Sequence, residues 1–252
     1  MKHRIDFRLL ACSAFLAVPV AAFAAGAGAP HWGYAGHDGP SHWGELSKDY
    51  TTCGIGKEQS PINITGAAKS DLPAIKFDYK ASALKEINNG HTVQVNVEPG
   101  SSIQVGERKF DLVQFHFHTP SEEQVNGKSY DAVWHLVHKD AAGKLGVVGV
   151  LVKAGKANAE IDKVLANLPK EQNKEHAASA QIDPKQLLPA DRAYYHFMGS
   201  LTTPPCSEGV SWYVLKQPIE ASKEQVAKLH SLFGNNARPV QPLHARALKE
   251  SK

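Results

Sequence analysis

The sequence predicts a mostly β, or α+β, protein whose sheet is mainly antiparallel. Short runs rich in β-branched and aromatic residues recur along the chain, as is typical of strands. These runs cover residues 75–79, 92–97, 109–117, 130–138, 145–152 and 210–215. No helical pattern of ten to fifteen residues separates each pair of runs, as a parallel doubly wound sheet would require. We therefore expect strands that pair mainly in antiparallel fashion, with few helices outside the sheet.

Two helices are predicted from their capping patterns. Asn158 can cap a helix that runs to about Leu168, and residues 222–225 form a capping box that opens a helix to about Phe233. The segment 171–178 is also expected to be rich in helix, and no chemistry is assigned to it.

One hairpin and one irregular segment are predicted. Asn89 and Gly90 lie between two strand-like runs, and both residues tolerate the positive φ that a tight primed turn needs. His91 is therefore expected to start a strand. Residues 31–61 are rich in Gly, Pro, Trp and Ser, so we expect an irregular segment that lies over the domain and is tethered by its tryptophan rings.

Residues 1–24 are predicted to be a signal peptide. Lys2, Arg4 and Arg8 precede an apolar run, and an Ala-x-Ala cleavage signal ends the segment. The alternative is a membrane anchor, but the apolar run is shorter than the ~20 residues of a span and is interrupted by a proline. Residues 25–252 are expected to form a single domain in the periplasm or outside the cell, because no repeat or long linker divides them.

The charge of the chain gives no reason to expect a nucleic-acid partner. The formal net charge is +3, and removal of three basic residues and Asp6 with the signal peptide leaves +1. A nearly neutral protein lacks the basic patch that binds a phosphate backbone. The sequence does not fix the oligomeric state, and a homodimer is one expectation.

Two cysteines, Cys53 and Cys206, remain after the signal peptide is removed. An oxidising compartment favours a disulfide between them, and the loop-entropy model gives on the order of 5 kcal/mol for closing so long a loop. The alternative is a pair of free, buried thiols. A bridge would tie the segment that follows Thr203 to the N-terminal part of the domain.

Three histidines are predicted to form a zinc site. His116 and His118 alternate along one strand and point to the same face, and His135 lies on the next strand-like run. Two imidazoles on one apolar face carry four ring nitrogens that need partners in the interior, and a metal ion supplies one partner for each ring. His138 points away from the site if its run is extended. Three histidine ligands would leave a fourth zinc position open to water.

Four motifs together resemble an alpha-class carbonic anhydrase of the exported bacterial type. They are QFHFH at 114–118, HLVH at 135–138, QSPINI at 59–64 and SLTTPP at 200–205, and the resemblance extends over about residues 31–248. It implies a central twisted, largely antiparallel sheet of about ten strands, short peripheral helices, and zinc at the base of a cone-shaped cleft. It also implies reversible hydration of carbon dioxide to bicarbonate and a proton, by attack of zinc-bound hydroxide.

The resemblance implies a role for each matching residue. The residues that match ligands of one Zn²⁺ are His116, His118 and His135, and those that match catalytic groups are His91, Glu122 and Thr202. The residues that match the wall around carbon dioxide are Val137, Val147, Leu201, Thr203, Val210 and Trp212. The residues that match the polar proton path are Tyr34, Asn89 and Gln94; Gln114 matches a partner of the first ligand, and Cys53 and Cys206 match the disulfide of bacterial members. Sulfonamide and anion inhibitors are expected, as is a side activity on esters.

The chemistry explains why these residue types are needed. Glu122 can accept the hydroxyl proton of Thr202, so that the acceptor side of that oxygen faces the nucleophile and orients it. His91, if it titrates near neutrality, can carry the released proton through ordered water to buffer.

One residue departs from the family pattern. Two residues before its third ligand the family commonly has a Glu that accepts the ligand's second ring proton, whereas this chain has Val133. His135 is therefore expected to donate to a backbone carbonyl or water, and the loss of such a partner can cost ~10 to 100-fold in metal affinity or activity. We expect zinc to be held more weakly than in members with the Glu, and a Val133→Glu change to slow its loss.

Two alternative functions remain to be weighed. His116, His118, Glu122 and Gly127 also resemble the first metal motif of cupins, whose sites hold iron or manganese, but the second cupin motif is missing. A periplasmic zinc-binding protein without catalysis would not need a Glu, a Thr and an apolar pocket together.

Overall fold

The computed structural model describes residues 30–252, so the predicted signal peptide lies outside the described residues. A twelve-stranded sheet dominates this part of the chain, and three short strands form a second sheet. The strands are β1 (Asn63–Ile64), β2 (Ala68–Ser70), β3 (Ile75–Asp78), β4 (Ser82–Asn88), β5 (Val93–Asn96), β6 (Ser102–Val105), β7 (Arg108–His118), β8 (Gln124–Val125), β9 (Lys128–Ser129), β10 (Ala132–Lys139), β11 (Leu145–Ala154), β12 (Glu175–Ile182), β13 (Tyr194–Ser200), β14 (Glu208–Ala221) and β15 (Lys249–Ser251). The helices are η1 (Gly36–Asp38), α1 (Trp43–Leu46), η2 (Lys48–Tyr50), α2 (Thr52–Ile55), α3 (Ala159–Ala166), η3 (Pro184–Leu187) and α4 (Lys223–Phe233).

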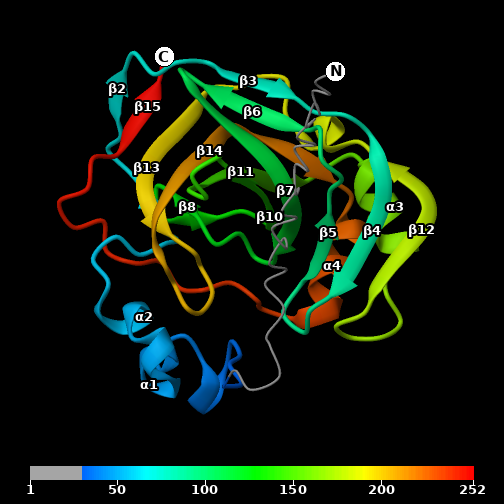
Figure 1. The fold of residues 1–252 in the computed structure, drawn as a ribbon, viewed down its shortest axis with the longest axis horizontal. Coiled ribbons are helices and arrows are strands. Elements are labelled where there is room, and N and C mark those ends of the chain that lie inside the picture. Colours follow the sequence, from blue (N-terminus) through cyan, green and yellow to red (C-terminus); the bar gives the residue numbers. More distant parts are fainter. Residues whose placement is uncertain (1–29) are drawn as a thin grey trace, which may run out of the picture.

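The large sheet is twisted and largely antiparallel, as predicted. Its main path runs β12-β4-β5-β7-β10-β11-β14-β13-β15-β2, with β3 and β6 attached beside β7. Figure 1 shows β12 and β4 at one edge and β2 and β15 at the other. Parallel pairing occurs between β11 and β14 and between β15 and β2.

The two faces of the central strands have different neighbours because side chains alternate along a strand. On β10, Trp134 and Leu136 pack into the larger apolar core, which also contains residues of α3 and α4. Val133 and Val137 pack into a second apolar cluster on the opposite face. His135 shares the face of these valines, so the sheet itself separates the metal site from the main core.

The two predicted helices are confirmed. The Asn158 side chain accepts hydrogen bonds from the first turn of α3. The Ser222 and Gln225 side chains complete the capping box of α4, and Gly234 ends that helix with a φ of 64°. No helix within residues 30–252 is long and apolar enough to cross a membrane.

The prediction of helix at 171–178 is wrong, because β12 begins at Glu175. This strand lies at the edge of the sheet and pairs with β4 alone, with a register shift between Ala177 and Gln181. Most of its side chains are exposed, so it lacks the alternating apolar pattern that identifies a strand. Pairing with the neighbouring strand has overridden its composition.

The predicted hairpin joins β4 to β5, but its turn differs from the expectation. Four residues connect the strands, and within the Asn89-Gly90 pair only Gly90 has a positive φ, of 87°. The Asn89 side chain accepts hydrogen bonds from the backbone N–H groups of His91 and Thr92 at 2.9 Å each, which stabilises the wider turn. His91 therefore lies in the loop and does not start β5.

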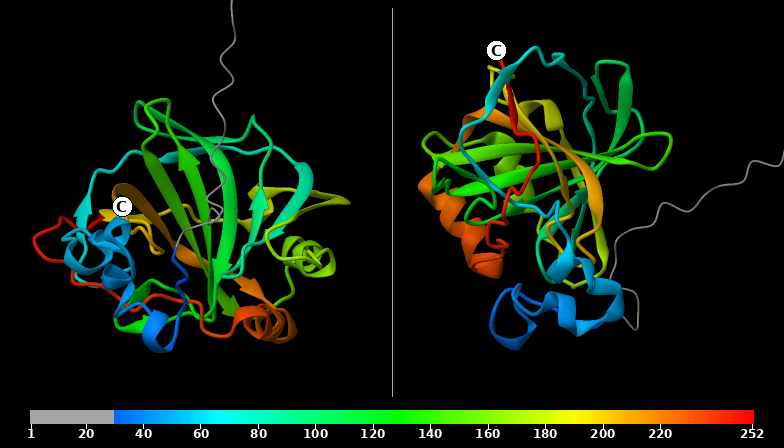
Figure 2. Two further views of the ribbon diagram at one scale, coloured as in Figure 1. Left: turned by 60° about the horizontal axis from the view of Figure 1, so that its bottom comes forward. Right: turned by 90° about the vertical axis from the view of Figure 1, so that its left-hand side faces the viewer.

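The segment before β1 lies outside the sheet, as predicted (Figure 2). It contains the short helices η1, α1, η2 and α2, which the prediction of an irregular segment missed. Trp43 is completely buried and its indole N–H donates to the backbone oxygens of Gly33 and Asp38. Trp32, Trp43 and Tyr50 form a small apolar cluster with Cys53 and Cys206. This cluster fixes the segment against the loop that carries Cys206.

Candidate metal centre and active site

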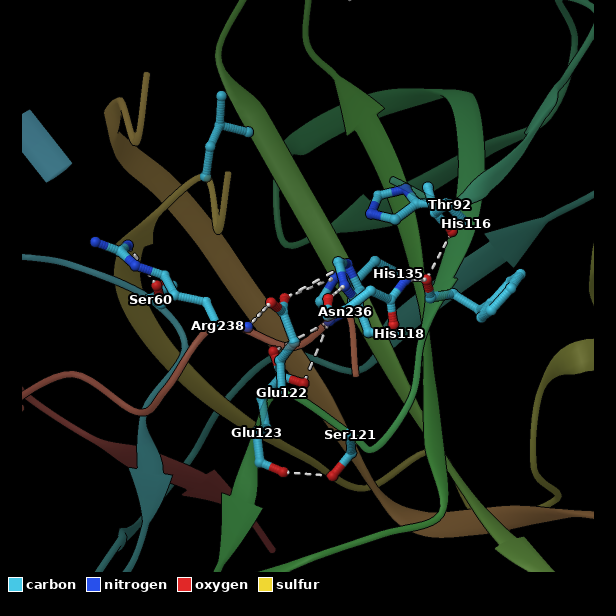
Figure 3. Close-up of polar contacts among 12 residues, drawn as sticks. Ser60, Thr92, His116, His118, Ser121, Glu122, Glu123, His135, Asn236 and Arg238 are labelled. Atoms are coloured by element: carbon cyan, nitrogen blue, oxygen red, sulfur yellow. Dashed lines mark hydrogen bonds and ion pairs between the residues drawn. The ribbon is translucent and has the colours of Figure 1, made fainter. Parts of the chain in front are cut away.

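Three histidines meet on two adjacent strands. His116 and His118 alternate along β7, and His135 on β10 pairs directly with His116. One nitrogen from each ring lies within 4.8 Å of one from each of the others, which is the arrangement of a three-ligand metal site. Figure 3 shows the three rings together above the loop that carries Glu122 and Glu123. His138 points into the other face, where its ring bonds the Tyr79 hydroxyl at 2.8 Å.

Each of the three rings has one nitrogen bound to a protein acceptor. The pairs are His116 Nδ1 with Gln114 Oε1 at 2.8 Å, His118 Nδ1 with the Asn236 carbonyl at 2.7 Å, and His135 Nε2 with both Glu123 carboxylate oxygens at 3.2 Å. A neutral imidazole that donates from one nitrogen presents a lone pair on the other. The metal-facing atoms are therefore Nε2 of the first two rings and Nδ1 of His135.

The chemistry of these nitrogens fits a metal ion. His118 Nε2 is buried and has no hydrogen-bond partner among residues 30–252. Burial of an unpaired polar atom costs free energy unless a ligand binds to that atom. Burial lowers the pKa of His116 to about 3 and that of His118 well below its usual value. Both rings are thus neutral, as a metal ligand must be.

His135 differs because carboxylates surround it. Burial acts to lower its pKa, but the negative charges of Glu123 and Glu122 outweigh burial and leave the pKa raised. Glu122 Oε2 lies 3.8 Å from the free Nδ1 of His135 and 3.5 Å from the free Nε2 of His118. A cation between these atoms would face three imidazole lone pairs and nearby negative charge.

Glu122 is buried beneath the metal-facing nitrogens. Its Oε1 accepts the Arg238 backbone N–H at 2.8 Å, whereas Oε2 has no hydrogen-bond partner of ordinary geometry among the described residues. Burial raises the pKa of Glu122 to about 7. Thr202 is 6% exposed and lies close enough for its hydroxyl to lower that pKa.

Arg238 joins three segments beneath the site through hydrogen bonds. Its guanidinium is buried and donates to Gln59 Oε1, the Ser60 carbonyl and the Cys53 carbonyl at 2.8–3.0 Å. One residue therefore links the carboxylate of Glu122 to the QSPINI segment and to the disulfide.

A cavity of about 260 Å³ opens over the three histidines. Its polar lining includes the predicted residues Tyr34, Asn89, His91, Gln94, Gln114, Thr202 and Thr203. Its apolar wall includes the predicted residues Val137, Val147, Leu201 and Trp212. Val210 does not line the cavity, because it is buried in the apolar cluster behind that wall.

His91 lines the cavity and stacks on an aromatic ring of the N-terminal segment. Its ring stacks on Trp32 with centroids 3.6 Å apart and planes at 9°, where the segment before β1 covers it. Burial, with a smaller contribution from His31, lowers the pKa of His91 to about 4. This lowered pKa differs from the expectation that His91 titrates near neutrality, because the stacked ring is partly shielded from water.

The predicted disulfide between Cys53 and Cys206 is confirmed. It joins α2 to the turn after Thr203 across 153 residues, with Cα atoms 5.0 Å apart. The Cys206 N–H donates to the Thr203 carbonyl at 2.8 Å, and its carbonyl accepts from Gln59 Nε2 at 3.1 Å. The turn that lines the cavity is thereby tied to the N-terminal segment.

The structure corrects the expected partner of His135. The acceptor is the carboxylate of Glu123 and neither a backbone carbonyl nor water. Sequence reasoning also missed Asn236 and Arg238, which lie in a segment without strand or helix pattern. The adjacent acids Glu122 and Glu123 were the one available signal for a second carboxylate at the site.

The fold and the site define a β-sheet protein with a candidate three-histidine metal centre at the base of a partly apolar cavity. The family model described as eukaryotic-type carbonic anhydrase matches residues 38–252, and the chain belongs to this family. The protein is therefore a lyase, and its membership of this family supports the hydration of carbon dioxide as its activity.

Individual relatives agree with this assignment. A carbonic anhydrase of Neisseria gonorrhoeae is 45% identical over 96% of this chain and 94% of its own length. A carbonic anhydrase of a Nostoc species is also 45% identical, over 88% of this chain and 86% of its own length. The solved alpha-carbonic anhydrase of Thermovibrio ammonificans, in complex with the inhibitor sulfanilamide, has 48% identity and a TM-score of 0.85 and covers 89% of this chain and 100% of its own.

Proposed function

We propose that this chain hydrates carbon dioxide reversibly in a zinc-dependent reaction, with His116, His118 and His135 as the ligands of one Zn²⁺. The observation that carries the proposal is the convergence of three ring nitrogens whose opposite nitrogens are each bound to a protein acceptor. A bound zinc ion would act as a Lewis acid and lower the pKa of a bound water to about 7, the value that zinc-bound water has in carbonic anhydrase, so that hydroxide would be available near neutral pH.

Thr202 and Glu122 would orient the nucleophile. The buried carboxylate of Glu122 can accept the Thr202 hydroxyl proton, which leaves a lone pair of the Thr202 oxygen facing the cavity. An acceptor at that place lets the nucleophile donate its own proton there and aim its reactive lone pair at the substrate. The contribution is positional, because Thr202 accepts a hydrogen bond from the nucleophile and does not remove its proton.

The apolar wall would hold carbon dioxide. The molecule has no dipole and offers little to hydrogen-bond, so it gains by leaving water for an apolar surface. Val137, Val147 and Trp212 are nearly fully buried and line the cavity on the side of His135. Leu201 completes this wall next to Thr202.

His91 would carry the product proton to solvent. Tyr34, Asn89 and Gln94 line the cavity near His91 and can order the intervening water. Because its pKa is about 4 in the stacked position, His91 must rotate away from Trp32 to accept a proton at neutral pH. The proposed cycle therefore includes a movement of this side chain.

The setting and inhibitors of the enzyme follow from the same features. The Cys53–Cys206 disulfide fits a periplasmic or secreted protein, since disulfides persist in oxidising compartments. Sulfanilamide is bound by the Thermovibrio relative, and we expect sulfonamides to occupy the cavity of this chain. Activated esters that fit the cavity are expected as slow side substrates. The sequence-based expectation of a homodimer would be tested by the mass of the protein in solution.

One set of measurements tests this proposal. Stopped-flow hydration of carbon dioxide should be fast in the zinc-loaded protein, should disappear after chelation and should be blocked by a sulfonamide. Zinc content should be one ion per chain. A protein that binds zinc at this ratio without hydrating carbon dioxide would be a zinc-binding protein, and iron in place of zinc would favour the cupin-like alternative.

A further inference from the structure

We propose that Glu123 is the positioning residue of His135, and that it supplies, from the segment between β7 and β10, the carboxylate that Val133 does not supply from β10. This inference rests on the proposed function, because it concerns how the chain holds zinc. The carboxylate would fix the tautomer and the orientation of the His135 ring. Glu122, its neighbour in sequence, would remain the partner of Thr202.

The contact between the two side chains is close and shielded from water. Both carboxylate oxygens of Glu123 lie 3.2 Å from His135 Nε2. The side chains of His135 and Glu123 are 2% and 0% exposed, so water does not compete for this bond. A hydrogen bond to a charged acceptor in such surroundings is stronger than one between neutral groups.

The loop that carries Glu123 is itself held in place. Ser121 Oγ donates to the Glu123 carbonyl at 2.7 Å and accepts the Tyr130 N–H at 2.8 Å. The Ser121 N–H donates to the Tyr130 carbonyl at 3.0 Å. Three hydrogen bonds through Ser121 thus close the loop next to the carboxylate, as Figure 3 shows for the bond to Glu123. The acceptor is therefore positioned before any metal arrives.

The position of the acceptor decides which nitrogen of His135 can bind metal. A carboxylate at Nε2 requires the proton on that atom, so the lone pair lies on Nδ1. His116 and His118 have the opposite tautomer, because their acceptors lie at Nδ1. Among the three rings only His135 has a charged acceptor, and such an acceptor raises the basicity of the ligand. Glu123 thus has an effect that the amide of Gln114 and a backbone carbonyl do not have.

Val133 occupies the place from which a second carboxylate could reach His135 Nε2. It is completely buried, belongs to the apolar cluster and lies on the same face of β10 as His135, about 7 Å away along the strand. A Glu at this position would bury a third carboxylate beside Glu122 and Glu123. Like charges this close cannot all ionise without a large cost. Positions 123 and 133 are therefore alternative sources of one carboxylate.

The test is a comparison of zinc loss from four variants: Glu123→Gln, Glu123→Ala, Val133→Glu, and Glu123→Ala combined with Val133→Glu. Each zinc-loaded protein is mixed with excess chelator and the release of zinc is followed. We expect release to be about 10 to 100-fold faster in Glu123→Ala than in the unmodified protein. Glu123→Gln retains the shape of the side chain and should show a smaller increase, which separates loss of charge from loss of packing.

The effect of the Val133→Glu change on zinc release should depend on whether Glu123 is present. With Glu123 present it should not slow zinc release, because it adds a competing buried charge. With Glu123→Ala it should slow release, because it restores a carboxylate near Nε2. Nitrogen NMR of the zinc-loaded protein gives a second readout: Nε2 of His135 should carry the proton in the unmodified protein and lose its strong acceptor in Glu123→Ala.

Glu86→Gln is the matched control, since Glu86 is an equally buried glutamate on the face of β4 that packs into the main core. Its zinc release should equal that of the unmodified protein. Unchanged release in both Glu123 variants at one zinc per chain would overturn the inference. Absence of zinc binding in the unmodified protein would instead overturn the proposed function, so the two failures are distinguishable.

Discussion

His91 and Trp32 stack face to face, with ring centroids 3.6 Å apart and an angle of 9° between the planes. The stack joins a loop of the hairpin to the segment before β1, two parts of the chain that are distant in sequence. It holds His91 at the edge of the cavity with a pKa of about 4, lowered by burial. For the proposed proton shuttle, the stacked position would be a resting state, and transfer of a proton near neutral pH would require the ring to leave the stack.

His91→Ala should slow the turnover of carbon dioxide in dilute buffer by about 100-fold or more, because the proposed role of the residue is general acid–base transfer at the cavity. Added imidazole should restore much of the rate, since a small base can enter the cavity in place of the missing ring. Stopped-flow rates at low and high buffer concentration would measure both effects. Equal rates for the variant and the unmodified protein in dilute buffer would remove His91 from the mechanism.

Thr202→Ala should lower the rate by about 100-fold without loss of zinc, because misorientation of a reacting group by roughly 1 Å can cost that much. Thr202→Ser retains the hydroxyl beside Glu122 and should keep most of the activity. Zinc content and stopped-flow rates of the two variants make the comparison. Wild-type rates in Thr202→Ala would contradict the orienting role of this hydroxyl.

The fold could be predicted in outline because its central strands carry strong local signals. The segments that became β7, β10 and β11 have apolar buried residues, many of them β-branched in β10 and β11, and the alternation along β7 placed His116 and His118 on one face. The helices α3 and α4 were marked by their caps. Edge strands such as β12 carried no such signal, since pairing with one neighbour was what determined their structure.

The site was predicted where spacing along one strand determined geometry, and missed where contacts join distant segments. The alternation of His116 and His118 follows from strand geometry alone. The acceptors of His118 and His135 are Asn236 and Glu123, which come from loops whose path depends on the whole fold. The stack of His91 on Trp32 likewise depends on tertiary structure, so its effect on the pKa could not be derived from the neighbours of His91 in sequence.

Replacing both Cys53 and Cys206 by Ala should lower the free energy of unfolding by about 3–5 kcal/mol, because the bridge closes a long loop and restricts the unfolded chain. Denaturant unfolding of the variant and the unmodified protein would give the difference. Reduction of the unmodified protein should have a similar effect, and reduction of the variant should have none. Equal stability of all three forms would show that packing of the apolar cluster around the bridge suffices to hold the segment.

Glu86 should make the protein less stable as the pH rises through neutrality. Its carboxylate is fully buried on β4, neither oxygen has a hydrogen-bond partner among the described residues, and burial raises its pKa to about 8. Between the ordinary pKa of a glutamate and about 8, the folded protein keeps the proton and the unfolded chain releases it. The unfolded state binds fewer protons over this window, so the free energy of unfolding falls as the pH increases.

Glu86→Gln should remove this dependence, because an amide has no proton to lose in that range. The variant should gain stability relative to the unmodified protein from pH 5 to pH 8, by on the order of 1–4 kcal/mol at the upper end. Denaturant unfolding at several pH values would measure the difference. Glu175→Gln, at an exposed position on the neighbouring strand β12, is the control and should leave the pH dependence as it is. Parallel stability curves for Glu86→Gln and the unmodified protein would mean that the Glu86 carboxyl titrates at its ordinary pKa in the folded state.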